Sequence, residues 1–453
     1  MKIKLYRSST VGIINDNFKL LTDPWLVDGE YYGSWSHYPK FEIINNLDEI
    51  NSYDAIYISH IHPDHFSTKT LKHINKKIPV YISSYHSKFL KFNIEKLGFK
   101  AIELSNGKRH KLKNNFFLTI YPADDCDPEL CYKFNGCAML DGKTNGSQQI
   151  DSLSVIDDGK FSILNVNDCP FELAQYPIKT KVLKNFEKID LLLTGYGGAG
   201  PYPQCFDNLN LDQKLLEGKK KEISFLEQAF QFIKTANPSF YLPFAGTYVL
   251  SGKLNTLQNL RGIPLLDTTY DYLEKKINSF YNEKKPEAIK LNIDESFCFD
   301  TKKYSNQYKK VNLIDLNQYQ QNYLNKLKLD YENDAMVEES TLLQNADLAM
   351  KKYIIKKNEL NIDVKSDIYL KFKDKFIKIP NSKDEIKVVS KKELDNSISF
   401  VVYNIDQRLL NRLLEGPKFA HWNNAEIGSH INFFRNPNIF ERNLYYSMNF
   451  FHK

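Results

Sequence analysis

The sequence lacks the marks of a membrane, secreted or nucleic-acid-binding protein. It contains no uncharged apolar run of the ~18 residues that a membrane span needs, so no span is expected. Its 6 cysteines in 453 residues have neither disulfide-scaffold nor zinc-finger spacing. A net charge of +6 is mild, and the basic run 219–221 is typical of a solvated helix face. The N-terminus is typical of a strand rather than a signal peptide. We therefore expect a soluble cytoplasmic protein that does not bind nucleic acid.

Histidine is also scarce, and its distribution is uneven. Only 10 histidines occur in the chain, and three of them fall in the run Y-I-S-H-I-H-P-D-H-F at residues 57–66. The apolar residues 55–59 before the run predict a short buried strand, and Pro63 keeps the chain turning after it. Imidazoles and a carboxylate that converge at a strand end suit a divalent transition metal such as zinc, iron or manganese.

The rest of the chain predicts more than one domain, because 453 residues exceed one ordinary core. Strands and helices alternate to about residue 245, which is typical of an α/β layered fold. We predict an α/β domain over residues 1–265, a mostly helical connection over 266–365, and a small α+β domain over 366–453. The last segment is similar to sterol-carrier domains over roughly 80 residues, on strand pattern alone.

The H-x-H-x-D-H run, His60 to His65, resembles the metal motif of the metallo-β-lactamase superfamily. The resemblance implies an αββα sandwich with two metals at the end of an inner strand. It implies that His60 and His62 serve one metal, that Asp64 and His65 serve the second, and that Asp168 bridges the two. From the residues alone, Asp168 also fits an N-cap for the helix expected from residue 171.

At two positions where that superfamily usually has a metal-binding histidine, this sequence has none. The strand predicted at residues 116–121 is followed by Asp124 and Asp125, and we predict Asp125 as a ligand, with Asp124 or an Asx turn as alternatives. No histidine occurs between His110 and His421, so the last position, near residues 243–246, has none. Carboxylates in place of imidazoles favour iron or manganese over zinc.

The tail holds a second concentration of polar residues, at residues 419–430. We predict that it folds back over the metal cleft, with Glu426 and His430 in catalysis. The residues predicted to bind substrate, from the tail and from the aromatic loop after residue 23, are Trp25, His37, Trp422, Asn423 and Asn424. The alternatives are a polar-capped turn with a core tryptophan in the tail, and a solvated histidine in the loop.

Five segments in order resemble the non-Rieske part of the CMP-N-acetylneuraminate hydroxylase family: residues 23–26, 60–65, 167–169, 243–246 and 422–426. The resemblance implies an iron-dependent monooxygenase that uses dioxygen on a nucleotide sugar or a related polar metabolite. Two irons are expected, with zinc or manganese as alternatives. The chain lacks the paired Cys-x-His and Cys-x-x-His segments of a Rieske module, so electrons would come from a separate protein.

Two other functions fit the residues. A metal-bound hydroxide attacks an ester, an amide or a phosphodiester in metal-dependent hydrolases. A catalytically silent metal-binding scaffold, whose tail binds a partner, needs the same residues and no turnover.

Overall fold

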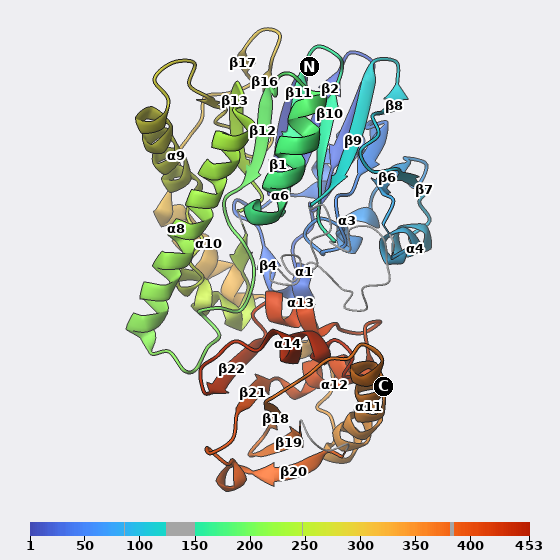
Figure 1. The fold of residues 1–453 in the computed structure, drawn as a ribbon, viewed down its shortest axis with the longest axis vertical. Helices are drawn as coiled ribbons and strands as arrows, with labels where there is room; N and C mark the ends of the chain where they lie inside the picture. The colour runs from blue at the N-terminus through green and yellow to red at the C-terminus, as the bar shows by residue number, and fades with distance from the viewer. Residues whose placement is uncertain (86, 124–149, 247, 381–384) are drawn as a thin grey trace.

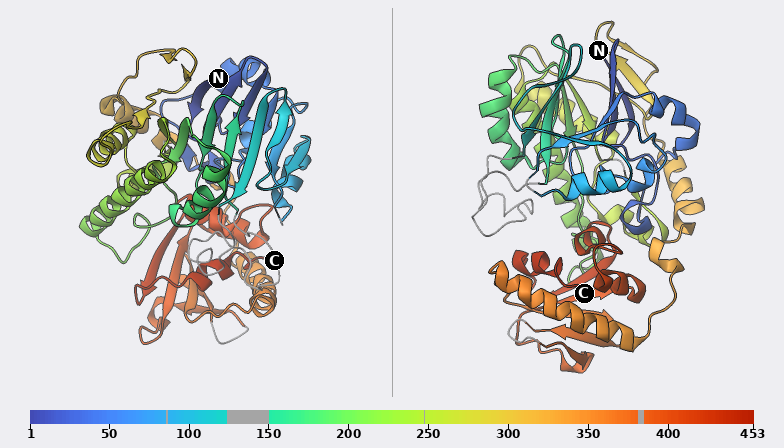
Figure 2. Two further views of the ribbon diagram at one scale, coloured as in Figure 1. Left: turned by 45° about the horizontal axis from the view of Figure 1, so that its top comes forward. Right: turned by 90° about the vertical axis from the view of Figure 1, so that its right-hand side faces the viewer.

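The computed structural model describes residues 1–85, 87–123, 150–246, 248–380 and 385–453. Two β-sheets pack face to face with helices on both outer faces, and a smaller unit lies beyond one edge of this sandwich (Figure 1). Two further views show the same arrangement, with the smaller unit holding the C-terminus (Figure 2). The αββα sandwich expected from the motif is therefore confirmed.

The strands of the first sheet are β1 (Lys2–Arg7), β2 (Thr10–Asn15), β3 (Phe18–Thr22), β5 (Ala55–Tyr57), β6 (Val80–Ser83), β7 (Ala101–Leu104), β16 (Glu295–Cys298) and β17 (Lys303–Tyr304). Within the described residues their order is β17-β16-β1-β2-β3-β5-β6-β7. β3, β5, β6 and β7 run parallel, while β1, β2 and β3 are joined antiparallel. β1, β3 and β5 consequently end at the same edge of the sheet.

The strands of the second sheet are β8 (His110–Lys113), β9 (Phe116–Pro122), β10 (Ser152–Asp157), β11 (Ser162–Asn165), β12 (Leu191–Gly195), β13 (Phe240–Phe244) and β15 (Glu287–Ala288). Their order is β15-β13-β12-β11-β10-β9-β8 in the part of the chain that the structure describes. Alternate apolar residues of the two sheets meet in the central core, among them Ile3, Leu20, Leu118, Leu193 and Phe297. A short pair, β4 (Trp35–Ser36) and β14 (Val249–Leu250), lies outside both sheets.

Amphipathic helices cover the two outer faces of the sandwich. Those on the first sheet are η1 (Ile43–Asn46), α2 (Leu47–Asn51), α3 (Thr68–Leu71) and α4 (Phe89–Lys96). Those on the second sheet are α6 (Phe171–Pro177), η2 (Ile178–Val182), α7 (Leu183–Asn185), α8 (Leu211–Ala236) and α9 (Leu266–Phe280). The longest of these, α8, begins at a capping box between Asn210 and Gln213 and ends at Asn237 in the left-handed conformation.

The two-sheet unit extends past residue 265, where the sequence analysis places its end. β15 joins the second sheet and β16 and β17 join the first, so the sandwich runs to Tyr304. The connection that follows consists of α10 (Leu313–Asn322), the 3-10 turns η4 (Leu324–Lys326) and η5 (Asp330–Asn333), and α11 (Glu339–Glu359). The stretch 324–335, expected to be helical, forms turns because Leu327 and Leu329 lie against Gly252 of the first domain.

The C-terminal unit is a sheet with helices, as expected of an α+β domain. Its strands and helices are β18 (Asp367–Phe372), β19 (Lys375–Ile379), β20 (Lys387–Ser390), η6 (Lys391–Glu393), β21 (Phe400–Ile405), α12 (Gln407–Glu415), α13 (Trp422–Ile427), β22 (Ile431–Asn436) and α14 (Arg442–Met448). α11 packs its buried side of Leu342, Ala346 and Met350 into the core of this unit.

The C-terminal unit is hydrogen-bonded to the sandwich. The backbone N–H of Phe433 on β22 donates to the carbonyl of Cys205 at 2.7 Å, and that of Asp207 donates to the carbonyl of Phe433 at 2.8 Å. The Phe206 and Phe433 rings stack at 5.2 Å. These contacts fix the C-terminal unit against the loop that precedes α8. Within the described residues, no helix is long and apolar enough to cross a membrane.

Candidate metal centre and the segment that closes it

The candidate site lies where several strands end at one edge of the sandwich. The His60–His65 run follows β5, Asp168 follows β11, and Asp151 directly precedes β10, which is antiparallel to β11. Asp23 follows β3, the parallel neighbour of β5. Strand direction alone therefore brings these polar side chains from four strand ends to the same place.

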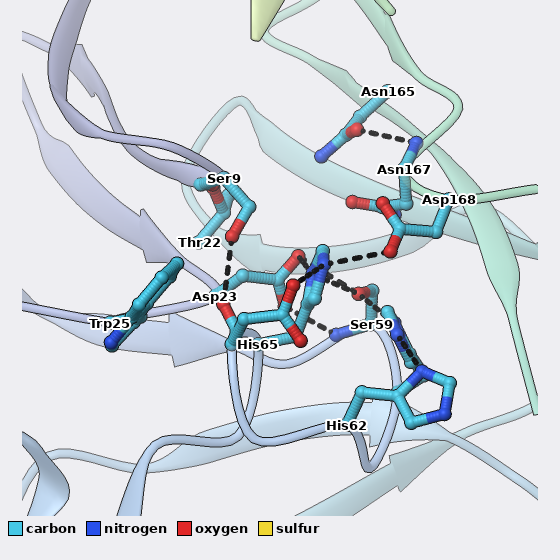
Figure 3. A network of polar contacts seen from close by, with 12 residues as sticks. Ser9, Thr22, Asp23, Trp25, Ser59, His62, His65, Asn165, Asn167 and Asp168 are labelled. Atoms are coloured by element: carbon cyan, nitrogen blue, oxygen red, sulfur yellow. Dashed lines mark hydrogen bonds and ion pairs between the residues drawn. The ribbon is translucent and has the colours of Figure 1, made fainter. Parts of the chain in front are cut away.

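Two groups of side chains in the described residues have ligand atoms within 4.8 Å of one another. One is His60, His62 and Asp151, and the other is His60, His65 and Asp168. His60 Nε2 lies 3.0 Å from His62 Nδ1 and 3.6 Å from an oxygen of Asp151. His65 Nε2 lies 3.3 Å from an oxygen of Asp168, the contact drawn in Figure 3. Both groups include His60, but a neutral imidazole has a single lone pair, so His60 would ligate only one ion. A second ion would rest on His65 and the carboxylates beside it.

Asp64 lies beside the same ring nitrogen of His65 as Asp168 does. One of its oxygens lies 3.6 Å from His65 Nε2, and the other accepts a hydrogen bond from the Tyr31 hydroxyl at 2.6 Å. Tyr31 belongs to the short helix α1 (Glu30–Gly33) and has a φ of 49°, which is unusual for a residue with a side chain. The loop after β3 thus orients the carboxylate of Asp64.

Asp23 holds the histidines in place and was not predicted as a site residue. The Asp23 carboxylate accepts two hydrogen bonds from Ser59, one from its backbone N–H at 2.7 Å and one from its hydroxyl at 2.8 Å. The same carboxylate lies 3.1 Å from His65 Nδ1 (Figure 3). The Ser59 hydroxyl also lies 3.0 Å from His60 Nδ1. A carboxylate on one ring nitrogen turns the other nitrogen towards the ion, as is usual behind metal-binding histidines.

The pKa shifts of the clustered side chains differ from one residue to the next. Burial and the neighbouring His65 and His62 hold the pKa of His60 well below its usual range, so its ring is neutral and able to ligate. Burial opposes a charge on His65, but Asp168, Asp64 and Asp23 raise its pKa well above its usual range. Burial raises the pKa of Asp168, yet His65 outweighs it and holds that pKa below its ordinary value.

Two buried atoms at this point lie within ion-pair distance of a neighbour but make no hydrogen bond of good geometry: His65 Nε2, beside Asp168 and Asp64, and one carboxylate oxygen of Asp151, beside His60. Buried polar atoms without a hydrogen bond are uncommon in folded proteins, so these two atoms favour a bound partner. Burial, with Asp168 next, raises the pKa of Asp151 to about 7. A divalent cation would satisfy both atoms and remove the cost of the clustered carboxylates. The donor set therefore fits the metal centre that the motif predicts.

Asp151 was missed by the sequence analysis, which expected a ligand at Asp125 or Asp124. Both of those residues lie outside the described residues. Asp151 accepts a backbone hydrogen bond from Ala123 at 3.3 Å, directly across from the end of β9. The signal was the pairing of β9 with β10, because antiparallel pairing places the residue before β10 beside the residues that follow β9.

We expect Asp151→Asn and Asp168→Asn each to lower metal content. Both changes keep the shape of the side chain and remove its charge, and a carboxylate ligand binds a hard cation better than an amide does. The measurement is metal stoichiometry by elemental analysis of the purified variants. Asp158→Asn, at the turn after β10, is the matched control. Unchanged stoichiometry in Asp168→Asn would leave that residue as no more than a structural aspartate.

The tail reaches the site through helix α13. Burial lowers the pKa of His62, while Asp64, Asp168 and a hydrogen bond with the Asn423 side chain raise it. Burial lowers the pKa of His421 to about 4, and the neighbouring His452 and His62 lower it further. His421 therefore lies near His62. The His421 N–H donates to the Tyr32 hydroxyl at 2.7 Å. The beginning of α13 therefore covers the His62 side of the centre.

Within the described residues, His430 contacts the site through the Tyr31 carbonyl. Its Nε2 lies 2.7 Å from the Tyr31 carbonyl, and its Nδ1 lies 3.2 Å from the Tyr331 hydroxyl. Burial lowers its pKa to about 4, so the ring is neutral. Because Tyr31 bonds to Asp64, His430 supports the loop that holds a predicted ligand. This geometry fits a positioning residue better than the catalytic role predicted from the sequence.

The tryptophans and His37 are buried rather than exposed in a substrate cleft. Trp422 packs in the C-terminal core and donates from Nε1 to the carbonyl of Phe451 at 2.9 Å. Trp25 donates to the carbonyl of Val27 at 3.0 Å and packs against His37 at 3.9 Å between ring centroids. The prediction that these tryptophans line the substrate cleft is corrected by their packing. His37 is 1 % exposed, so the solvated loop histidine is also excluded.

Glu426 and Asn424 face away from the described metal ligands. Asn424 interacts with the Tyr32 hydroxyl. The charge of Glu426 raises the pKa of Tyr403 and of Tyr445 in the C-terminal unit. One oxygen of Glu426 is buried without a hydrogen bond. Burial raises the pKa of Glu426 to about 8. Its described neighbours give no support to the catalytic role predicted for it.

The raised pKa of Glu426 predicts a pH dependence of stability. Its stabilising contribution is present below the unfolded pKa of about 4.5 and is lost as the pH rises through about 8. Glu426→Gln should therefore flatten the fall of the unfolding free energy between pH 5 and 9, by roughly a few kcal/mol. Chemical unfolding across this range measures it. Glu415→Gln, paired with Lys453 at 2.7 Å, is the control and should leave the slope as it is.

Comparisons with known proteins agree with the motif and the fold. Residues 2–143 match the family described as the beta-lactamase superfamily domain. The chain is 29 % identical over 232 residues to a protein of Mycobacterium tuberculosis named as a Rieske 2Fe-2S iron-sulfur protein, covering 50 % of this chain and 40 % of that one. It is 25 % identical over 243 residues to the cytidine monophosphate-N-acetylneuraminic acid hydroxylase of Danio rerio, covering 51 % and 35 %.

The matched segments thus span well under two thirds of these relatives. Among solved structures, the diiron β-hydroxylase CmlA of Streptomyces venezuelae aligns with a TM-score of 0.41 at 15 % identity, covering 64 % of this chain and 52 % of that one. An isothiocyanate hydrolase from Delia radicum gut bacteria aligns with a TM-score of 0.42 at 13 % identity, covering 66 % and 99 %. Likenesses at this level do not discriminate between oxidation and hydrolysis.

Proposed function

Starting from a chain whose residues 2–143 match the beta-lactamase superfamily domain, we propose that it is a non-haem diiron oxygenase. Its substrate is a polar small molecule such as a nucleotide sugar or a related metabolite. The observation that carries the proposal is the ligand set, in which three histidines share one edge with Asp64, Asp151 and Asp168. Oxygen-rich ligation favours a hard, redox-active ion over zinc.

Each residue of the centre has a part in holding the ions. His60, His62 and Asp151 would hold one, and His65 and Asp168 would hold the other with His60 or Asp64 close by. Asp23 fixes the ring of His65, and Tyr31 fixes the carboxylate of Asp64. Iron bound there supplies the dioxygen chemistry, which these side chains lack by themselves. The carboxylate of Asp168 is 39 % exposed, which leaves this side open to a substrate.

The electrons would come from another protein. The chain has no paired Cys-x-His and Cys-x-x-His segments with which to bind a Rieske cluster. The mycobacterial relative is named for such a cluster and is longer than the segment it shares with this chain. We propose that a separate Rieske-type protein supplies electrons to this one.

Hydrolysis of an ester, an amide or a phosphodiester is the second candidate. The matched family is described by the name of a hydrolase, and a paired site of this kind also serves to activate water. The two proposals differ in what they consume. An oxygenase requires dioxygen and a reductant, whereas a hydrolase requires neither.

The test is elemental analysis of protein purified without oxygen, followed by measurement of dioxygen uptake with a chemical reductant. We expect about two irons per chain, coupled in their spectra, and dioxygen uptake tied to product when nucleotide sugars are supplied. The double variant His60→Ala, His62→Ala is the control for adventitious iron. Turnover of substrate by zinc-loaded protein in the absence of oxygen would refute the oxygenase and establish the hydrolase.

A further inference from the structure

A second group of buried polar side chains lies at the same edge of the first sheet as the metal centre. Arg7 is the last residue of β1, and its side chain is fully buried. Its Nη2 donates to the carbonyl of Pro39, and its guanidinium lies 5.2 Å from the Phe41 ring centroid. Its Nε and Nη1 make no hydrogen bond. Two nitrogens of a buried cation are thus left without an acceptor.

The charge of Arg7 is also unbalanced. No carboxylate lies within ion-pair distance of it among the residues that the structure describes. Asp28 is the nearest acidic influence on its pKa, but Asp28 is engaged with His37. Burial raises the pKa of Asp28 to about 6, so the carboxylate is still mostly ionised at neutral pH, but it forms no ion pair with Arg7 among the described residues. A fully buried guanidinium without a paired anion is rare, because its desolvation is costly.

Two further unpaired groups accompany Arg7. His37 directs Nδ1 at the Asp28 carboxylate at 2.8 Å, and its Nε2 is buried without a partner. The hydroxyl of Tyr319, on α10, is buried and unpaired as well. The Tyr319 ring lies 5.5 Å from that of Tyr38, which stands between His37 and the Pro39 carbonyl that Arg7 contacts. Asp28 and Arg7 accordingly both act on the pKa of Tyr319. Three separate segments of the chain therefore present unused hydrogen-bonding atoms around one place.

We propose that Arg7, His37 and Tyr319 form a binding site for a small oxyanion that carries a hydroxyl group. The unused N–H groups of Arg7 and the hydroxyl of Tyr319 are donors for the anionic oxygens. With its Nδ1 proton directed at Asp28, His37 presents Nε2 as an acceptor for the ligand hydroxyl. Hydrogen phosphate and a hydroxycarboxylate share this chemistry.

The position of the site connects it with the metal centre. β1 and β3 end at the same edge, and the hydroxyl of Ser9, two residues after Arg7, donates to the carbonyl of Asp64 at 3.1 Å. His37 packs on Trp25, two residues beyond Asp23. The anion site is nevertheless built from residues that bind no metal, so it does not depend on the proposed oxidation.

The experiment is calorimetric titration of the full chain with inorganic phosphate, lactate and acetate at constant ionic strength. We expect saturable binding of phosphate or lactate, and weaker binding of acetate, which lacks the hydroxyl. The stronger of the first two identifies the kind of ligand. Absence of saturable binding by both phosphate and lactate would overturn the proposal and leave ordered water as the partner of Arg7.

Two substitutions on one helix locate the site. Tyr319→Phe removes only the unpaired hydroxyl and should weaken binding about 10-fold, as expected for a hydrogen bond to a charged group. Tyr323→Phe, whose ring lies 5.2 Å from that of Tyr319, is the matched control and should bind as the wild type does. Arg7→Lys, which keeps the charge but loses the guanidinium geometry, should weaken binding further.

One more variant distinguishes the anion site from the metal centre. His60→Ala, His62→Ala should retain anion binding even when it has lost metal. Equal effects of Tyr319→Phe and Tyr323→Phe, or loss of anion binding in the double histidine variant, would place the anion elsewhere and refute the site at Arg7. Loss of dioxygen uptake with retained anion binding would instead count against the proposed oxygenase alone.

Discussion

Replacing His60 and His62 together by alanine is expected to strip the protein of metal and abolish turnover. Nε2 of His60 lies 3.0 Å from Nδ1 of His62, and His60 belongs to both groups of possible ligands. Removing only an outer partner of a metal ligand typically costs 10–100-fold, so loss of two ligands should cost more than about 100-fold in metal affinity or activity. Elemental analysis of the purified variant measures the metal directly.

The fold should survive this change. His60 is buried and neutral, and its replacement removes no charge on which the core depends. Circular dichroism and unfolding should therefore remain close to those of wild type after metal removal. His73→Ala, an exposed histidine near α3, is the control and should keep its metal. Full occupancy in the double variant would refute the metal centre at this position.

Replacing Asn423 by alanine is the second change with a large expected effect. Asn423, in the first turn of α13, lies close enough to His62 to raise its pKa, and it belongs to a unit more than 350 residues later in the chain. Loss of this contact should lower metal affinity or turnover by 10–100-fold, as is typical of groups that orient a ligand. Metal titration and steady-state turnover of the full chain measure both quantities.

The neighbouring residue provides the control. Asn424 interacts with Tyr32 rather than with a predicted ligand, so Asn424→Ala should keep the metal affinity of wild type. Equal metal affinity in Asn423→Ala and wild type would show that the tail only packs against the sandwich. Its link to the site would then be through His430 and Tyr31, which position Asp64.

Deleting the tail is a poorer test than the sequence suggests. The residues from Phe419 onward include Trp422, Phe433, Leu444 and Phe451 of the C-terminal core. Their removal would expose the apolar faces of β21 and α12, and side chains of this size each stabilise the fold by roughly 1.5–3 kcal/mol. We expect the truncated protein to lose its C-terminal unit, so a loss of activity would not identify a role in the site.

The sequence by itself determined the main parts of the first domain. The strand predicted at residues 116–121 is β9 (Phe116–Pro122), because short apolar and aromatic runs bounded by turns are a local signal. The motif at His60–His65 likewise predicts a metal site after a buried strand. Its four polar residues are close in sequence, so their convergence needs only one strand and one turn.

The domain limits were harder to predict. β15, β16 and β17 are short and follow α9, so their local pattern does not reveal which sheet they join. Their pairing with β13 and β1 depends on contacts across more than 40 residues of sequence. Hydrophobic periodicity reports which face of an element is buried, but it carries no information about the partner.

Only the tertiary structure showed which distant polar atoms meet. Asp151 comes beside His60 where the two sheets meet, next to the hydrogen bond from the Ser152 hydroxyl to the Ser59 carbonyl, and Asp23 comes behind His65 through the pairing of β3 and β5. Arg7 and Tyr319 are 312 positions apart and are brought together by the return of α10. A buried polar atom is defined by its neighbours in space, and those neighbours are set by strand register and domain packing, which no local pattern encodes.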